Sequence, residues 1–158
     1  MADPLADERL TTFGLLLEAH DGLVARLSPQ LATHGLPPAE FEALLRLART
    51  PGARLRMSDL AAQLRLSTSG LTRLVDRLER RRLAERVACP SDRRSAFAAI
   101  TSDGTDLVRE AVCGHLFLLE QWFTGLLDAD ELAALTATLR KLRDVVQPGA
   151  VAGATPVA

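Results

Sequence analysis

The sequence predicts a mainly α-helical protein with one small β-hairpin. Three observations favour this fold class. Apolar residues recur at three- and four-residue spacing along most of the chain, as they do in amphipathic helices. Two short segments, 84–88 and 95–100, are expected to be strands joined by the polar residues 89–94. The 158 residues suit one core, and 47% hydrophobic with 25% charged residues is typical of a globular domain.

A long amphipathic helix is expected from Leu5 to about Thr33. Its apolar side chains fall on one stripe between Leu10 and Leu31. At ~1.5 Å per residue the helix reaches ~40 Å, which is longer than a small core needs. We therefore expect part of it to pack against another subunit. Gly35 is well placed to end it as a left-handed cap.

Two short elements follow the first helix. Leu36-Pro37-Pro38 starts a second helix with proline in its first turn, and Thr50-Pro51-Gly52 breaks it. The residues Arg54-Leu55-Arg56 alternate between polar and apolar but are too few for more than one edge strand.

A helix, a tight turn and another helix come next. Ser58 is expected to cap a short helix from Asp59 to Leu64, and Ser67 or Thr68 caps the helix that follows. In this following helix, four apolar residues at i, i+3, i+4 and i+7 are expected to enter the core: Leu71, Leu74, Val75 and Leu78. The opposite face is left with hydroxyl and guanidinium groups, so it is expected to face outward.

The C-terminal part is predicted to consist of the hairpin with a basic tip, two helices and a tail. Thr101 begins the first helix, which runs to about Leu127, and Asp128 caps the last helix, which ends at Pro148. The small, uncharged residues of the tail, 148–158, are expected to be disordered.

Charge is distributed unevenly along the chain. The formal net charge is −1, yet residues 65–94 hold nine arginines against four acids. Such a basic surface suits a nucleic acid, because arginine side chains replace the counterions that condense on its phosphates. The simpler alternative for an isolated run of charge is a solvated helix face. The position of this run, on a polar helix and on a hairpin tip, favours nucleic acid.

A helix, a turn, a helix and a basic-tipped hairpin in this order indicate a winged helix-turn-helix. The second helix of such a unit fits the major groove of DNA, and the hairpin, or wing, lies near the adjacent backbone or minor groove. We expect one domain over residues 1–147. Within it, 54–100 form the DNA-binding lobe, and 5–34 with 101–147 form the dimerisation helices.

Three motifs resemble the MarR (multiple antibiotic resistance regulator) family of bacterial transcriptional regulators. They are the helix pattern LTRLVDRLE at 71–79, Leu83-x-x-Arg86, and Asp92-Arg93-Arg94-Ser95 with Ile100-Thr101-Ser102-Asp103-Gly104 after it. The resemblance implies an obligate homodimer that binds an inverted-repeat operator in double-stranded DNA and usually represses a nearby gene. Two recognition helices would then lie ~34 Å apart.

The resemblance also implies which residues contact DNA. The recognition-helix positions are Ser67, Thr68, Ser69 and Thr72, with Arg73 and Arg77 as base or phosphate contacts. Arg93 or Arg94 would be the wing arginine, and Asp92 would orient a neighbouring arginine. Arg82 departs from the family pattern, because relatives commonly have glycine after the recognition helix. A left-handed cap costs a non-glycine residue roughly 1 kcal/mol, so we expect this helix end to be shaped differently.

A small-molecule effector is the usual switch of the family that the chain resembles. It is often aromatic and anionic, and it occupies a pocket between the dimer helices and the DNA-binding lobe. By resemblance the pocket would draw on Phe13, Leu17, His20, Phe41, Leu45 and Val112. The simpler alternative for most of these residues is an ordinary position in the core. For His20 the simpler alternative is a core histidine whose ring nitrogens are hydrogen-bonded.

Two alternatives to ligand control stay open. A redox switch could use the thiol of Cys89, beside the wing, or that of Cys113, although peroxide-sensing relatives carry their cysteine in the first helix, which has none here. A winged helix can also serve protein contact alone. That role would not need guanidinium groups on both the helix and the wing.

Other classes of function find no support in the sequence. His20, His34 and His115 lack the spacing of metal ligands, and motifs of catalytic sites are absent, so we expect no cofactor, no metal and no enzyme. No apolar run approaches the roughly 20 residues of a membrane-spanning helix. The acidic N-terminus does not resemble a secretory signal, and a cytoplasmic protein is therefore expected.

Overall fold

The computed structural model describes residues 3–89 and 92–150; for Cys89 and residues 92–95 it describes the backbone alone. Its α-helices are α1 (Glu8–Ala32), α2 (Pro38–Ala48), α3 (Met57–Leu64), α4 (Thr68–Arg80), α5 (Ser102–Trp122) and α6 (Ala129–Val146). The strands β1 (Arg54–Arg56), β2 (Ala84–Cys89) and β3 (Asp92–Ile100) form one antiparallel sheet in the order β1-β3-β2. Short 3-10 turns lie at Pro4–Ala6, Pro51–Ala53 and Thr124–Leu126. The predicted fold class is confirmed.

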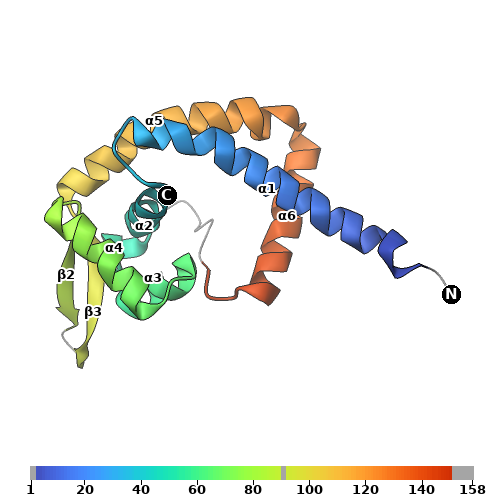
Figure 1. Cartoon of the computed structure of the whole chain (residues 1–158). Coiled ribbons are helices and arrows are strands. Elements are labelled where there is room, and N and C mark those ends of the chain that lie inside the picture. Colours follow the sequence, from blue (N-terminus) through green and yellow to red (C-terminus); the bar gives the residue numbers. More distant parts are fainter. Residues whose placement is uncertain (1–2, 90–91, 151–158) are drawn as a thin grey trace.

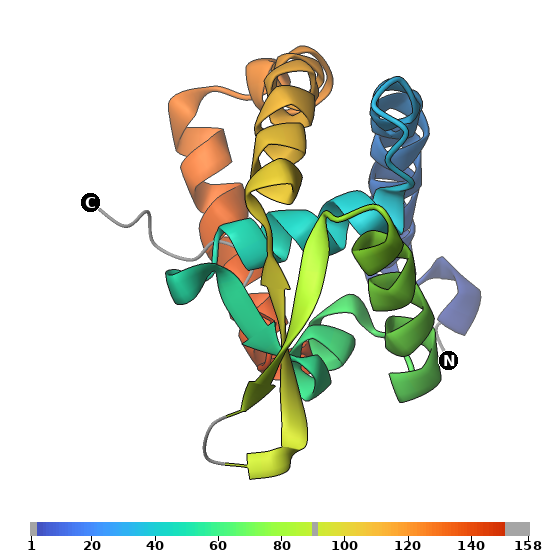
Figure 2. The same cartoon turned by 90° about the vertical axis from the view of Figure 1, so that its left-hand side faces the viewer.

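The molecule has two parts. A lobe is formed by α3, α4 and the sheet, with α2 packed on it, whereas α1 and α5 run side by side and extend beyond it (Figure 1). From the far end of α5, α6 returns in the direction of the lobe (Figure 1). The turned view shows the hairpin of β2 and β3 projecting from the lobe (Figure 2). This arrangement is the winged helix-turn-helix with a separate helical region that the sequence predicts.

The core of the lobe lies where α2, α3 and α4 meet. Its largest fully buried side chains are Leu36, Leu44, Leu47, Leu60, Leu71, Leu74, Val75 and Leu78. The last four are the stripe predicted on α4. Burying each such side chain stabilises the fold by about 1.5–3 kcal/mol. The apolar face of α4 is therefore fixed, and its polar face is turned outward.

Three of the predicted helix caps are present, and one is wrong. Ser67, Thr101 and Asp128 each accept a hydrogen bond from a backbone N–H in the first turn of α4, α5 and α6. In contrast, α3 begins at Met57, and Ser58 donates its hydroxyl hydrogen to Asp59. The cause is the preceding strand, since Arg56 still pairs with Phe97 of β3 and the helix starts directly after it.

The fifth helix ends earlier than predicted, at Trp122 instead of about Leu127. Thr124 Oγ1 donates to Glu120 Oε2 at 2.6 Å. The chain turns so closely here that a Cβ on Gly125 would lie 2.5 Å from the carbonyl oxygen of Glu120. The helix therefore gives way to a 3-10 turn before α6.

The start of α5 is anchored to the end of α4. The Thr101 N–H donates to Leu83 O at 3.2 Å, and Thr101 Oγ1 donates to Arg82 O at 2.6 Å. A Cβ on Gly104 would overlap the Leu83 carbonyl. Glycine at this position thus permits the contact that joins the helical region to the lobe.

The C-terminal end of α6 turns back to the lobe. Gln147 Nε2 lies 3.4 Å from the carbonyl oxygens of both Ala62 and Gln63 on α3, and Ala150 is buried. The folded chain therefore continues to Ala150, inside the tail expected from residue 148. Residues 151–158 lie outside the described part of the chain.

Candidate DNA interface

The outward face of α4 begins with a cluster of hydroxyl groups. Ser67 Oγ accepts a hydrogen bond from the Gly70 N–H at 3.1 Å and lies 3.1 Å from Ser69 Oγ. Ser67, Thr68, Ser69 and Thr72 are all exposed. A helix N-terminus carries partial positive charge and free N–H groups, which favour an anion. The structure thus brings together the four hydroxyl residues predicted from sequence, at an end of the helix that suits a phosphate.

Arg73 follows these hydroxyl groups on the exposed face. Within the described residues its guanidinium group forms no hydrogen bond or ion pair. A free guanidinium group keeps its full capacity for paired hydrogen bonds to guanine or to phosphate. Arg73 is therefore well placed for the role that the sequence predicts.

Arg77 has an internal partner instead. Its Nε donates to Glu40 Oε1 at 2.8 Å, and Arg81 donates to Glu40 Oε2, also at 2.8 Å. Glu40 lies in the first turn of α2, and its side chain is 4% exposed, against 46% for Arg77. A buried carboxylate is costly unless cations pair with it. Arg77 thus joins α2 to α4, a contact that the predicted DNA role does not include.

A second ion-pair cluster joins α4 to the wing strand β2. The guanidinium group of Arg86 contacts Asp76 at 2.7 Å, donates to Thr72 O at 3.2 Å and pairs with Glu79. Glu79 Oε1 also accepts the Arg86 backbone N–H at 2.8 Å. The wing is thereby held against the recognition helix by two carboxylates of that helix.

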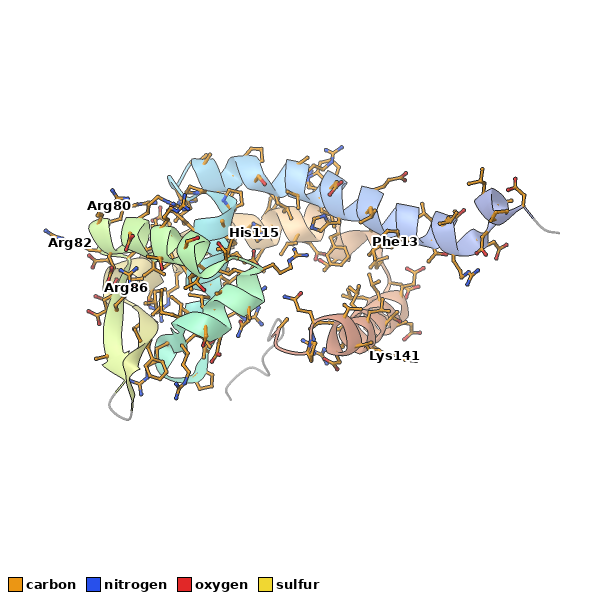
Figure 3. All side chains as sticks on the ribbon, turned by 60° about the horizontal axis from the view of Figure 1, so that its bottom comes forward. Phe13, Arg80, Arg82, Arg86, His115 and Lys141 are labelled. Carbon is orange, nitrogen blue, oxygen red and sulfur yellow. The ribbon has the colours of Figure 1, made fainter. Side chains whose placement is uncertain are left out.

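The basic residues therefore divide into two sets. Arg77, Arg81 and Arg86 are paired with carboxylates. Arg65, Arg73, Arg80 and Arg82 are exposed and have no such partner in the part of the chain that the structure describes; Arg80 donates only to the backbone carbonyl of Asp76. Figure 3 shows Arg82 reaching outward, while Arg86 lies between α4 and β2. Only some of the arginines in this basic region are therefore unpaired and available to contact DNA.

The predicted wing residues Asp92, Arg93 and Arg94 lie at the start of β3, which begins at Asp92 and not, as expected, at residue 95. Asp92 pairs with Cys89 of β2 in the sheet register. Their backbone positions place them beside the hairpin tip, but their side chains lie outside the described part of the molecule. Their contacts with DNA remain predictions.

The end of α4 differs from what the sequence predicts. Arg82 adopts the left-handed conformation, with φ +60°, and the Leu83 N–H donates to Leu78 O at 2.9 Å. The expectation of a differently shaped helix end is wrong, because arginine here adopts the conformation that glycine usually supplies. The contact of Thr101 with Arg82 O holds this conformation in place.

The residues predicted for an effector pocket fall into two groups. Phe13, Leu17 and His20 are exposed on α1, whereas Phe41 is buried and Leu45 and Val112 are partly buried around the core. Figure 3 shows Phe13 well away from His115, whose ring contacts Phe41 of the second group. A single chain therefore does not bring the six residues into one pocket.

His115 is a residue that the sequence did not single out for this region. Its ring centroid lies 4.9 Å from that of Phe41. Its Nδ1 atom and the Oε1 atom of Gln30 are buried without a hydrogen-bond partner among the described residues. Burial lowers the pKa of His115, since a charged imidazole loses hydration there.

The other candidate chemistries gain nothing from the structure. No cluster of three or more metal-ligating residues occurs within the described ranges. Cys113 is a free, exposed thiol on α5, whereas the side chain of Cys89 lies outside them. None of the helices described could cross a membrane, because none is both long and apolar enough.

The helices outside the lobe expose many large apolar side chains. Examples are Leu10, Phe13, Leu16 and Leu17 on α1, Leu116 and Phe117 on α5, and Leu139, Leu142, Val145 and Val146 on α6. None of the residues of α6 is buried. An exposed apolar surface of this extent is typical of regions where protein chains associate.

Comparison with known proteins agrees with this architecture. The regulator MhqR of Bacillus subtilis is 28% identical over 138 residues, which cover 87% of this chain and 93% of that protein. AbsC, a MarR family transcriptional regulator from Streptomyces coelicolor, superposes with a TM-score of 0.83 at 30% identity, covering 93% of this chain and 99% of the other. Sco3205, of the same family and organism, was solved in complex with DNA; its TM-score is 0.81 at 30% identity, with 94% and 93% covered.

Fold, site and relatives together define a transcriptional regulator of the winged helix-turn-helix class. The family model described as MarR family matches residues 34–95, which span the lobe up to the wing. The chain belongs to the MarR family.

Proposed function

We propose that this protein is a homodimeric repressor that binds an inverted-repeat operator. The observation that carries the proposal is the polar face of α4, where four exposed hydroxyl residues lead to Arg73, which is unpaired within the described chain. The apolar face of the same helix is fully buried, so only this polar face is available to a major groove. MprA of Escherichia coli, 27% identical over 140 residues, is named a transcriptional repressor, which supports the direction of control.

Dimerisation is part of the proposal. The exposed apolar side chains of α1, α5 and α6 supply a surface that a second copy would cover. Two recognition helices related by a twofold axis would then enter successive major grooves, ~34 Å apart. Leu142→Glu is expected to place a charge in this interface and to yield monomers in sedimentation experiments, whereas Arg140→Glu, an exposed neighbour, serves as the control.

DNA binding is tested by fluorescence anisotropy with the intergenic DNA upstream of the gene, at several salt concentrations. Tight binding that prefers this DNA over a random duplex and weakens steeply with salt supports the proposal. If the upstream DNA is not preferred, selection from a random-sequence pool identifies an operator located elsewhere. Failure to enrich any sequence would contradict the proposed function.

We further propose release of the operator by a small effector, of an aromatic and anionic kind. Support comes from BpsR of Bordetella bronchiseptica, whose DNA binding is described as regulated by 6-hydroxynicotinic acid; it superposes with a TM-score of 0.70 at 27% identity. In this chain Phe41 belongs to the core and contacts His115, and Leu45 and Val112 pack against the same core; we take these four residues as candidate ligand contacts. A panel of aromatic carboxylates added to the anisotropy assay tests the idea, and an absence of any release would count against it.

A further inference from the structure

The face of the sheet that points away from the core carries two arginines and one aromatic ring. Arg56 of β1 pairs with Phe97 of β3, and Arg54 pairs with Ala99. Directly paired residues point to the same face of a sheet. The guanidinium carbons of Arg54 and Arg56 lie 5.2 Å and 5.5 Å from the centre of the Phe97 ring, within the range of cation–π contacts. We call these three residues the Arg54–Phe97–Arg56 patch.

No carboxylate neutralises this patch among the residues that the structure describes. Both arginines are exposed, and neither makes a hydrogen bond or an ion pair there. Glu85 is the acid that the register puts on the same face, opposite Ala99 on the far side of β3, and it has no ion pair with either arginine. Two neighbouring cations repel each other, and a bound anion would remove this cost.

The position of the patch relative to the recognition helix follows from the sheet order. The helix α4 contacts β2, β2 pairs with β3, and β3 pairs with β1. The two arginines of the patch are therefore on the strand that is separated from α4 by the other two strands, and Phe97 is on the middle strand. Figure 2 shows β1 beside the projecting hairpin. For this patch to contact DNA, the duplex that meets α4 has to continue beyond the wing to this side of the lobe.

We propose that the Arg54–Phe97–Arg56 patch binds backbone phosphates of duplex DNA outside the segment read by α4. The inference rests on the proposed DNA-binding function. The Phe97 ring holds the two guanidinium groups in place, so less side-chain entropy is given up when they bind. Phosphate oxygens accept paired hydrogen bonds from arginine, and such contacts position a protein without reading sequence. In a dimer, the two patches lengthen the contact at both ends of the operator.

The test compares two lengths of one selected operator. The long duplex extends the inverted repeat by about one helical turn at each end, and the short duplex ends with the repeat. Anisotropy at several salt concentrations is measured for the wild type and for Arg54→Gln/Arg56→Gln, which keeps most of the side-chain length. Arg140→Gln/Lys141→Gln, two exposed cations on α6, removes the same charge outside the lobe. Melting temperatures confirm that each variant is folded.

On the long duplex, Arg54→Gln/Arg56→Gln is expected to lower the slope of log affinity against log salt by about 1 for each phosphate that the variant no longer neutralises. On the short duplex it is expected to bind as the wild type does. Arg54→Lys/Arg56→Lys keeps the charge and is expected to retain most of the slope. The control on α6 is expected to match the wild type on both duplexes.

Three results would overturn the inference. The first is an unchanged slope on the long duplex. The second is an equal decrease on both duplexes, or an equal decrease in the α6 control, because the charges would then act through the general field of the protein. The third concerns polyglutamate, a probe for acidic proteins measured in the same anisotropy assay: if Arg54→Gln/Arg56→Gln loses binding to polyglutamate but keeps its slope on DNA, the patch would be assigned to an acidic protein. Wild-type protein without any preferred operator would remove the proposed function and this inference together.

Discussion

Glu40 and Arg77 are 37 positions apart in the sequence, yet a hydrogen bond of 2.8 Å joins them. Glu40 is on α2 and Arg77 is on the recognition helix, so the pair fixes the position of α4 relative to α2. Phe41, next to Glu40, contacts His115 of α5. The orientation of the recognition helix is thus linked through α2 to a helix outside the lobe.

Glu40→Gln is expected to destabilise the protein and to weaken DNA binding. Glutamine has the size of glutamate but lacks the negative charge that pairs with both Arg77 and Arg81. Its amide N–H groups are donors, and they would face the donor groups of the two guanidinium ions. The free energy of unfolding should fall by about 1–3 kcal/mol, which lowers the melting temperature by about 2–4 °C for each kcal/mol.

The control for this change is Glu42→Gln. Glu42 pairs with Arg46, but its side chain is half exposed, so the cost should stay at about 0–1 kcal/mol. Urea denaturation measures both variants. An equal decrease in unfolding free energy for both variants would show that the burial of Glu40 does not increase its contribution to stability.

Arg73→Ala and Arg77→Ala are expected to have different effects, although the sequence predicts the same role for both. Arg73 has no partner in the described chain, so its removal should leave stability unchanged and weaken operator binding by about 10- to 100-fold. Arg77→Ala should lower stability, because Glu40 is left with one of its two cations. Melting curves together with anisotropy separate the two cases; a stable Arg77→Ala protein with strongly reduced affinity would make Arg77 a direct DNA contact.

Local patterns predicted most of the fold, whereas the partners of the charged residues could not be predicted. The stripe of Leu71, Leu74, Val75 and Leu78 and the cap at Ser67 are set by neighbours within one helix, and both are confirmed. The pairing of Glu40 with Arg77 depends on how two separate helices pack. A sequence shows nine arginines between 65 and 94, but only packing decides which of them meet carboxylates.

Gly104→Ala is expected to be strongly destabilising. A Cβ there would overlap the carbonyl of Leu83, and backbone cannot move aside as a flexible side chain can. We expect a decrease of about 3 kcal/mol or more in the free energy of unfolding. Gly22→Ala is the matched control, because its Cβ meets nothing within 4 Å and helix propensity alone favours alanine by about 0.5–1 kcal/mol. A folded Gly104→Ala protein with wild-type stability would contradict the close contact between α5 and Leu83.

Arg82→Gly is expected to stabilise the protein. Arg82 has φ +60°, and relief of this left-handed conformation is worth about 1 kcal/mol. Arg82→Ala removes the same side chain but keeps the unfavourable backbone, so it should not raise the melting temperature. If both variants change the melting temperature equally, the backbone conformation of Arg82 is not the cause of the change in stability.

Stability is expected to fall in mild acid because of His115. Burial lowers its pKa in the folded protein below the usual 6.5, so the unfolded chain binds a proton more readily. Stability therefore declines as pH falls below about 6.5, and the decline continues down to the lowered pKa of the folded state. His115→Gln should flatten this part of the curve of unfolding free energy against pH, measured by urea denaturation between about pH 8 and pH 5. His20→Gln, at an exposed position on α1, should keep the wild-type slope, and an unchanged slope in His115→Gln would assign the acid sensitivity to other groups.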